Sequence, residues 1–283
     1  MIQRNLIILM LFMLMELNLN AQDITVVSYN IRLDVASDSL NRWDNRKDFL
    51  IGQLNFHDPD VFGIQEGLLH QLEEIKQGMP GYIYLGKGRE DGLKNGEFSA
   101  IFYNSEKLEL LEENTFWLSE TPQLPSKGWD AAIKRVCTYG LFKVKGGAQK
   151  FLVFNTHFDH RGEEARKESV FLIIEKIQEL NEQNLPVILT GDLNLEPDHP
   201  SILLLSSVMQ DAHIIAGDGA FGPNGTFNGF NFSEPITRRI DYIFLSKTGF
   251  QLLKYGILSD SKDLRYPSDH FPVLAKLSIT ETE

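Results

Sequence analysis

Residues 188–194 read Ile-Leu-Thr-Gly-Asp-Leu-Asn, an apolar run that ends in an aspartate and an asparagine. The same pattern, apolar residues followed by groups that bind metal or move protons, recurs four more times, at 26–30 (Val-Val-Ser-Tyr-Asn), 61–66 (Val-Phe-Gly-Ile-Gln-Glu), 154–159 (Phe-Asn-Thr-His-Phe-Asp), and Ile240-Asp241 with Ser268-Asp269-His270. Ligand sites collect where strands end, because loops there present side chains from a rigid base. One acidic strand end is commonplace, but five in one chain predict a polar site.

Strands alternate with helices around these segments. Period-two apolar runs predict strands at 24–29, 61–64, 82–85, 99–103, 108–117, 136–144, 151–155, 187–190, 240–245, 252–258 and 271–279. Helical spacing predicts helices at 43–55, 68–77, 163–181 and 201–207. So many strands, with helices between only some of them, indicate an α/β (α+β) fold of two packed sheets flanked by helices. We find no repeat and no internal boundary, and predict one domain over residues 22–283.

Composition sets the protein class. Of the 283 residues, 42% are hydrophobic and 23% are charged, which excludes a disordered or fibrous chain. The single cysteine, Cys137, excludes a disulfide framework or a thiolate metal cluster, and we expect it to be packed as a small buried hydrophobe. The net charge of −12 argues against broad binding to polyanions, and it fits either ordinary solubility or carboxylates gathered around bound cations.

The first 21 residues have the layout of a secretory signal peptide. Arg4 supplies positive charge, an apolar run covers 6–15, and Ala21 offers a small residue for cleavage. The run is shorter than the roughly 20 apolar residues that a bilayer span needs. We therefore expect cleavage after Ala21, a secreted or periplasmic monomer, and no stable insertion into a membrane.

Oxygen-bearing side chains at the strand ends predict a magnesium site. Mg²⁺ prefers oxygen ligands, keeps several waters, and needs only one or two carboxylates from the protein. Glu66 is the natural first ligand with help from Asn30, and Asp269 adds a ligand or supports one. Mn²⁺ is the alternative ion.

The remaining polar strand ends suit proton transfer to and from water. His270 has the chemistry of a general base, and Asp241 that of the carboxylate that orients it. His157 and Asn194 can hydrogen-bond phosphoryl oxygens, where negative charge develops. Asp192 lies two residues before Asn194, so on a strand both face the same side. Asp192 would orient the attacking water or protonate the leaving oxygen.

Each segment alone also fits a simpler explanation. Gly191-Asp192 fits a turn, Asn30 a strand-ending turn residue, and Asp269-His270 the start of a strand. Asp241 is harder to dismiss, because a carboxylate between apolar neighbours on a strand is paired when it is buried. We therefore infer an active site from the five segments taken together and not from any one of them.

As a set, these motifs resemble the endonuclease/exonuclease/phosphatase superfamily, the deoxyribonuclease-I-like enzymes. The resemblance covers the chain after residue 21 in the family's order, and its most specific parts are Gln65-Glu66, Gly191-Asp192-Leu193-Asn194 and Arg239-Ile240-Asp241-Tyr242. It implies a four-layer α/β sandwich with two central mixed sheets. It also implies Mg²⁺ at Asn30 and Glu66 with Asp269 on the metal side, phosphate contacts from His157 and Asn194, alignment of the nucleophile or leaving group by Asp192, and an Asp241–His270 dyad.

Residues 116–122 and Gly128-Trp129-Asp130 resemble a bacterial branch that is distantly similar to deadenylases and nocturnin. The resemblance adds three candidate substrate contacts, which are Arg135, Arg166 and Trp117. Core packing is the alternative for Trp117, and a surface pair with Glu163 or Glu164 is the alternative for Arg166.

The sequence predicts a secreted Mg²⁺-dependent phosphoesterase, of a diester or a monoester, and leaves the substrate open, because one fold hosts many activities. A secreted nuclease acting on DNA or RNA is an alternative, although no Lys/Arg run is present. A binding protein that kept the fold without the chemistry is another, but it would be expected to lack a residue such as Glu66 or His270. A zinc hydrolase would need spacing such as His-Glu-x-x-His, which is absent.

Overall fold

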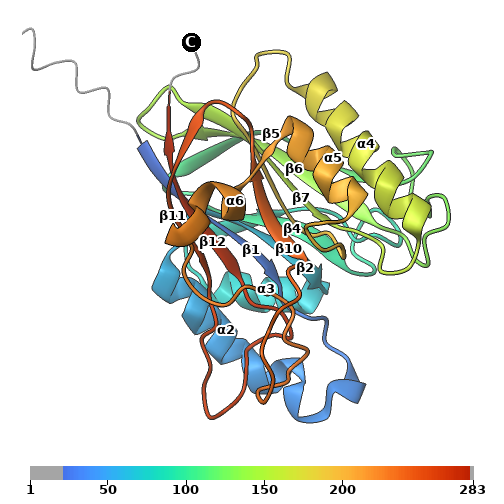
Figure 1. The fold of residues 1–283 in the computed structure, drawn as a ribbon, viewed down its shortest axis with the longest axis vertical. Coiled ribbons are helices and arrows are strands. Elements are labelled where there is room, and N and C mark those ends of the chain that lie inside the picture. The colour runs from blue at the N-terminus through green and yellow to red at the C-terminus, as the bar shows by residue number, and fades with distance from the viewer. Residues whose placement is uncertain (1–21, 281–283) are drawn as a thin grey trace, which may run out of the picture.

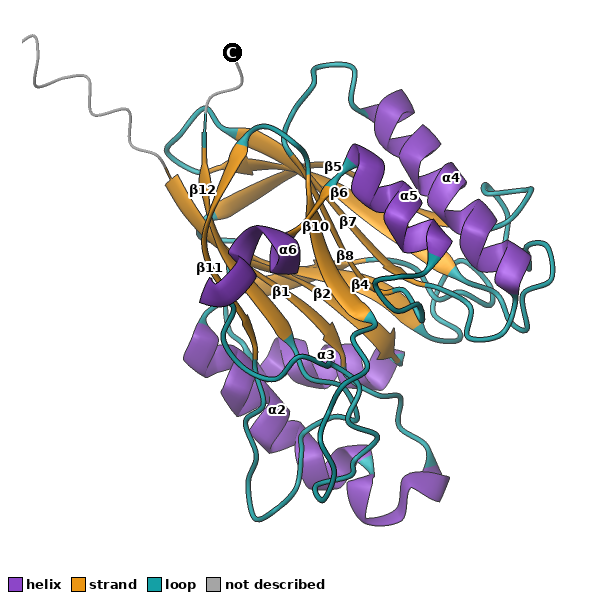
Figure 2. Cartoon of the chain, viewed as in Figure 1, coloured by secondary structure: helices purple, strands orange, loops and turns teal. Residues whose placement is uncertain are grey.

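The computed structural model describes residues 22–280. The predicted signal peptide at residues 1–21 lies outside this range, as do residues 281–283. Two six-stranded sheets lie against each other, with helices on their outer faces (Figures 1 and 2). This arrangement confirms the predicted four-layer sandwich with two central mixed sheets.

Each sheet contains one parallel pair of strands. In the first sheet, β1 (Gln22–Asn30) runs parallel to β2 (Val61–Gly67), within the order β11-β12-β1-β2-β4-β3. In the second, β7 (Lys150–His157) runs parallel to β8 (Val187–Asp192), within the order β5-β6-β7-β8-β10-β9. The other strands pair antiparallel; they are β3 (Tyr82–Leu85), β4 (Phe98–Asn104), β5 (Leu108–Trp117), β6 (Val136–Val144), β9 (Gln210–Asp211), β10 (Asp241–Leu245), β11 (Phe250–Ile257) and β12 (Val273–Ile279).

Three apolar clusters hold the four layers together. The first lies between the sheets and joins residues such as Val26 and Val61 to Val153 and Ile188. The second packs α4 (Glu163–Leu180) and α5 (Pro200–Val208) on the second sheet. The third packs α2 (Trp43–His57) and α3 (Leu69–Gly78) on the first sheet. Strands covered on both faces are expected to read as continuous apolar runs, as 61–64 and 187–189 do.

The expected elements are all present, with ends that differ by a few residues. Three short helices, η1 (Ala36–Asn41), α6 (Ala212–Ala216) and η2 (Gly217–Gly219), and the two-residue strand β9 were not predicted, because segments this short carry no periodic pattern. Cys137 is fully buried and free, as expected. Within residues 22–280, no helix is long and apolar enough to cross a bilayer.

A buried asparagine joins the two sheets directly beneath the polar strand ends. Asn155 on β7 is fully buried, and its Nδ2 donates to the main-chain carbonyls of Ile64 and Ala100 in the first sheet, at 2.8 Å each. Its Oδ1 accepts from Gln65 Nε2 at 2.7 Å and from Thr190 Oγ1 at 3.0 Å. Every hydrogen-bonding position of this amide is used, so the amide fixes the two sheets against each other.

Gly63 on β2 makes this contact sterically feasible. A Cβ on Gly63 would lie 2.3 Å from Thr190 Oγ1 and 2.4 Å from Asn155 Oδ1. Any larger residue at position 63 would therefore push β2 away from β7 and β8.

Replacing Asn155 by Ala should lower the free energy of unfolding by roughly 3–5 kcal/mol, because it removes the side-chain donor from two buried carbonyls and leaves Gln65 Nε2 with only its long contact to Ser28 Oγ. Denaturation in urea measures the change, and Asn45→Ala on the exposed face of α2 should stay within about 0.5 kcal/mol of the unmodified protein. Equal stabilities of the two variants would contradict this role for Asn155.

Candidate active site

The five polar strand ends converge on one pocket of about 350 Å³. Of the predicted site residues, those that line it are Glu66, Arg135, His157, Asp192, Asn194, Asp269 and His270. Asn30 and Asp241 are fully buried beside it and contact lining residues. The side chains come from β1, β2, β7, β8 and β10, from the turn after β8, and from the loops that precede β6 and β12.

Asn30 links the two ends of the site. Its Nδ2 donates to Glu66 Oε1 at 3.1 Å and to Asp192 Oδ2 at 2.9 Å. Glu66 has a φ of 63°, in the left-handed region, where β2 loses register with β4 between Ile64 and Gly67. A bulge of this kind redirects a side chain that a regular strand would point elsewhere, and strained residues of this type gather at functional sites.

Glu66 and Asp269 form an oxygen-rich, cation-attracting end of the pocket. Burial, the first cause, and the nearby charge of Glu66 raise the pKa of Asp269, while His270 and Arg32 oppose the rise. The guanidinium of Arg32 approaches both carboxylates, with nitrogen atoms 3.9 Å from Glu66 Oε2 and 3.8 Å from Asp269 Oδ2. Two crowded carboxylates with an asparagine beside them are a donor set that fits a hard divalent cation.

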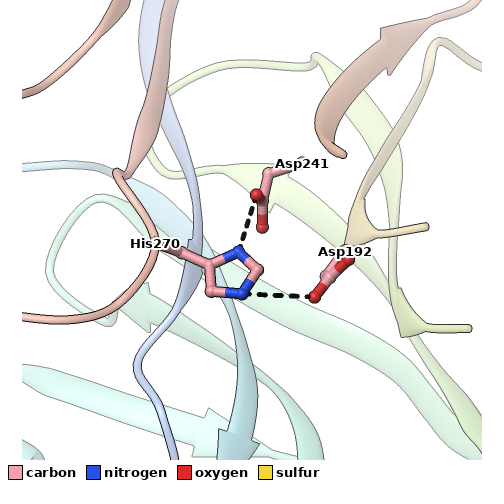
Figure 3. Close-up of side chains that lie close together, drawn as sticks. All are labelled: Asp192, Asp241 and His270. Carbon is pink, nitrogen blue, oxygen red and sulfur yellow. Dashed lines mark hydrogen bonds and ion pairs between the residues drawn. The ribbon is translucent and has the colours of Figure 1, made fainter. Parts of the chain in front are cut away.

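His270 lies between two aspartates at the other end of the pocket. Its Nδ1 is 2.8 Å from Asp241 Oδ2, and its Nε2 is 3.8 Å from Asp192 Oδ2 (Figure 3). Asp241 lies opposite Asp192 in the β10–β8 register, and its main-chain N–H donates to Thr226 Oγ1 at 3.1 Å. The direct His270–Asp241 hydrogen bond fixes the ring with Nε2 facing Asp192, which is the geometry of a proton-transfer dyad.

The two aspartates set the protonation of this group. Burial disfavours the imidazolium of His270, but the carboxylates of Asp241 and Asp192 outweigh burial and raise its pKa to about 10. Burial, followed by the charge of Asp241, raises the pKa of Asp192 well above the usual value for a carboxyl group. The donor atoms of the three side chains lie within 4.8 Å of one another, so they compete for the same proton or cation.

His157 is an uncharged hydrogen-bonding group. Burial, followed by the charges of Arg135 and His270, lowers the pKa of His157 well below its usual value. Its Nε2 lies 3.1 Å from Asn194 Nδ2, which can only donate and also donates to the Phe158 carbonyl. The ring proton therefore resides on Nδ1, a buried atom that has no hydrogen-bond partner within residues 22–280, and Nε2 also lies 3.4 Å from Asp192 Oδ2.

The sequence predicts that Asn194 shares a strand face with Asp192, but in the structure it does not. β8 ends at Asp192, and Asn194 has a φ of 51° in the following turn, where its main-chain N–H donates to Asp192 Oδ1 at 2.9 Å. The turn still brings both side chains into the pocket.

Arg135 lies in the pocket wall, where a positively charged residue that faces the substrate was expected. Its side chain is almost fully buried, and its Nε has no hydrogen-bond partner in the described part of the chain. Asp159 lies 3.8 Å away and is itself held by the main-chain N–H groups of Arg161 and Gly162. Asp159 is therefore a fixed negative charge that holds the Arg135 guanidinium in place.

The structure places two predicted substrate contacts, Trp117 and Arg166, outside the pocket lining. Trp117 is buried, and its Nε1 donates to the main-chain carbonyl of Arg89 at 2.8 Å, so it packs beneath a loop. Arg166 lies on α4, forms an ion pair with Glu163, and is absent from the pocket lining. Both follow the alternatives noted from the sequence.

Sequence reasoning missed several lining residues, namely Arg32, Glu97, His160 and Arg238. Arg32 and Arg238 lie within three residues of Asn30 and Asp241, so proximity to those motifs was an available signal. Glu97 lies in a loop with no motif around it, and no sequence pattern marks it.

Comparison with known proteins places this geometry in a family. The family model described as the Endonuclease/Exonuclease/phosphatase family matches residues 27–270. A crystal structure of a protein of that family from Bacteroides thetaiotaomicron is 44% identical, with 92% of this chain and 99% of that chain covered and a TM-score of 0.88. A mannosyl-6-phosphatase from the same organism is 45% identical, with 90% and 100% covered and a TM-score of 0.86.

A more distant match confirms the expected relation of the fold to nocturnin. The human nocturnin catalytic domain is 20% identical, with 91% of this chain and 95% of that chain covered and a TM-score of 0.72. The chain spans 55 to 62% of the length of three curated relatives that it matches.

Replacing Asp241 by Asn should lower the pKa of His270 well below about 10 in the metal-free protein, because the attraction of Asp241 is lost while burial still opposes the imidazolium. Proton NMR titration of the histidine rings in EDTA measures this, with His270→Ala used to assign the signal. Since the folded-state pKa of about 10 exceeds the ordinary 6.5, the contact stabilises the fold fully below pH 6.5 and loses this effect as the pH rises through about 10. A ring pKa that Asp241→Asn leaves unchanged would disprove the pairing.

Proposed function

The chain belongs to the endonuclease/exonuclease/phosphatase family, and on that premise we propose that it is a Mg²⁺-dependent phosphatase that hydrolyses a small phosphate monoester. The observation that carries the proposal is the convergence of Glu66, Asp192, His157 and the Asp241–His270 pair on one pocket. A cation-attracting end and a proton-transfer end in the same pocket are the two parts that hydrolysis of a phosphate ester by water requires.

The metal would be held by Glu66 and Asp269, with Asn30 beside them. The hard oxygen donors and the charge that they concentrate suit Mg²⁺, and Mn²⁺ fits the same donors. When bound, the ion supplies Lewis-acid polarisation of a phosphoryl oxygen.

The protein's own groups bind the phosphate and move the proton. The His157 ring and the Arg135 guanidinium bind phosphoryl oxygens and offset their charge, and the Asn194 amide does so when one of its hydrogens leaves the Phe158 carbonyl. Asp192 and His270 lie 3.8 Å apart, and His270 already carries its proton at neutral pH. A water beside this pair therefore gives its proton to the Asp192 carboxylate as it attacks phosphorus, while the P–O bond to the leaving group breaks and the leaving oxygen takes up a proton from solvent. Asp241 keeps the ring oriented and stabilises its protonated form.

A monoester is favoured over a nucleic acid for two reasons. The relative named as a mannosyl-6-phosphatase is 45% identical and is covered along its whole length, which supports a sugar phosphate as the first substrate to assay. The net charge of −12 opposes broad attraction of a polyanion. A secreted nuclease is the second candidate, and a binding protein without turnover is the third.

A substrate panel tests the proposal. Mannose 6-phosphate, phenyl phosphate, inositol phosphates, a phospholipid, RNA and DNA are assayed with Mg²⁺ and with EDTA. We expect release of phosphate from the monoesters with Mg²⁺ only. Cleavage confined to DNA or RNA would replace the proposal with the nuclease, and the absence of all turnover would favour the binding protein.

His270→Ala should lower kcat on the best ester about 10²–10⁴-fold while the protein stays folded, because a positioned acid–base group contributes about that much. His70→Ala, which removes an exposed imidazole paired with Asp34, is the matched control and should keep full activity. Circular dichroism checks folding. Unchanged turnover in His270→Ala would reject its role in proton transfer.

We also propose that the protein acts outside the cytoplasm, on the support of the signal-peptide pattern at residues 1–21. Expression of the full chain followed by fractionation and N-terminal sequencing should give an exported protein that begins at Gln22. Full-length protein that keeps Met1 and stays in the cytoplasm would refute this.

A further inference from the structure

One carboxylate in the catalytic pocket has no part in the mechanism above. Glu97 lines the pocket together with His157 and Asp192, and its side chain is only 13% exposed. The same lining holds three arginines, namely Arg32, Arg135 and Arg238. Cations are expected where a phosphate binds, but a carboxylate repels phosphate, so Glu97 needs a different explanation.

Glu97 is part of a group of donors and acceptors on one wall. Its Oε1 lies 2.7 Å from Arg89 Nη2, and a small recess is lined by Glu97, Arg89, Arg135 and His157 together. Arg89 Nη1 and Arg135 Nε are buried without hydrogen-bond partners within residues 22–280. Buried donors that lack partners are rare; Arg135 lines both the catalytic pocket and the recess, whereas Arg89 lines the recess alone.

The loop that carries this wall is held in place before any ligand binds. The main-chain N–H of Arg89 donates to the carbonyl of Glu97 at 3.0 Å, which closes the loop between them. Beneath it, the buried indole of Trp117 donates to the carbonyl of Arg89 at 2.8 Å. A group fixed in this way recognises a ligand without first losing conformational freedom.

The chemistry of the wall matches hydroxyl groups. A carboxylate oxygen accepts from an O–H, and a guanidinium N–H donates to the oxygen of the same or a neighbouring hydroxyl. A ligand with one anionic group and several hydroxyls would use the arginines and His157 at its phosphate and Glu97 at its hydroxyls. We propose that Glu97, paired with Arg89, is the specificity-determining residue that binds hydroxyl groups of the substrate, which is therefore a polyhydroxylated phosphate monoester such as a sugar phosphate. This rests on the proposed function.

The test compares an ester that carries hydroxyls with one that has none. For mannose 6-phosphate and phenyl phosphate with Mg²⁺, kcat/KM is measured in the unmodified protein, in Glu97→Gln and in Glu90→Gln. Glu90 is the matched control, because it pairs with the same Arg89 at 3.5 Å but is exposed and lies outside the pocket.

In Glu97→Gln, kcat/KM for mannose 6-phosphate should fall about 10- to 100-fold, mainly through KM, because a charged hydrogen bond to a hydroxyl is lost. The value for phenyl phosphate should change less than about threefold, and Glu90→Gln should resemble the unmodified protein on both esters. An equal change on both esters would show that Glu97 only balances the charge of the arginines, and would overturn the inference.

A measurement on the unmodified protein covers the case in which Glu97→Gln fails to fold. Deoxy analogues of mannose 6-phosphate are assayed one position at a time, and at least one should lose tenfold or more in kcat/KM. If every analogue matches the parent sugar, hydroxyl recognition is rejected while the phosphatase proposal stands. If the unmodified protein hydrolyses neither mannose 6-phosphate nor phenyl phosphate, the proposed function itself fails.

Discussion

The hydrogen bonds of Asn155 between the two sheets are the constraint on which the rest of the site depends. Asn155 and Thr190 each lie two residues before a site residue, His157 and Asp192, and Gln65 lies immediately before Glu66. These polar contacts fix β2, β7 and β8 relative to one another one or two residues before the site residues. The site side chains on these strands therefore have little conformational freedom. The contact between the sheets thus fixes the part of the catalytic geometry that lies on strands, while loops place Asn194, Asp269 and His270.

Charge is divided along the pocket. Glu66 and Asp269 concentrate negative charge at one end, while Asp241 and Asp192 hold a proton on His270 at the other. Asn30 donates to a carboxylate of each end, so the two halves share one buried amide. His157 is uncharged and Arg135 is buried in the pocket wall. Both bind ligand atoms without giving a proton to the group formed by Asp192, Asp241 and His270.

Much of this could be predicted from the sequence, and the exceptions have physical causes. Strand ends and their polar residues are local patterns, so Asn30, Glu66, Asp192 and Asp241 could be found before the fold was known. Arg166 lies outside the pocket lining, which could not be foreseen because the direction of a helical side chain depends on how α4 packs on its sheet. Glu97 was missed because only the folded loop, supported by Trp117, turns it into the pocket.

The central claim is that a cation and a proton occupy opposite ends of this pocket. A crystal structure with Mn²⁺ and inorganic phosphate, with the ion located by its anomalous scattering, tests it most directly. The account predicts the ion at Glu66 and Asp269, with the phosphate on His157 and Asn194 and the Asp241–His270 hydrogen bond intact. An ion bound among Asp192, Asp241 and His270 would contradict it, because these groups would then be metal ligands and the proton-transfer pair would not exist.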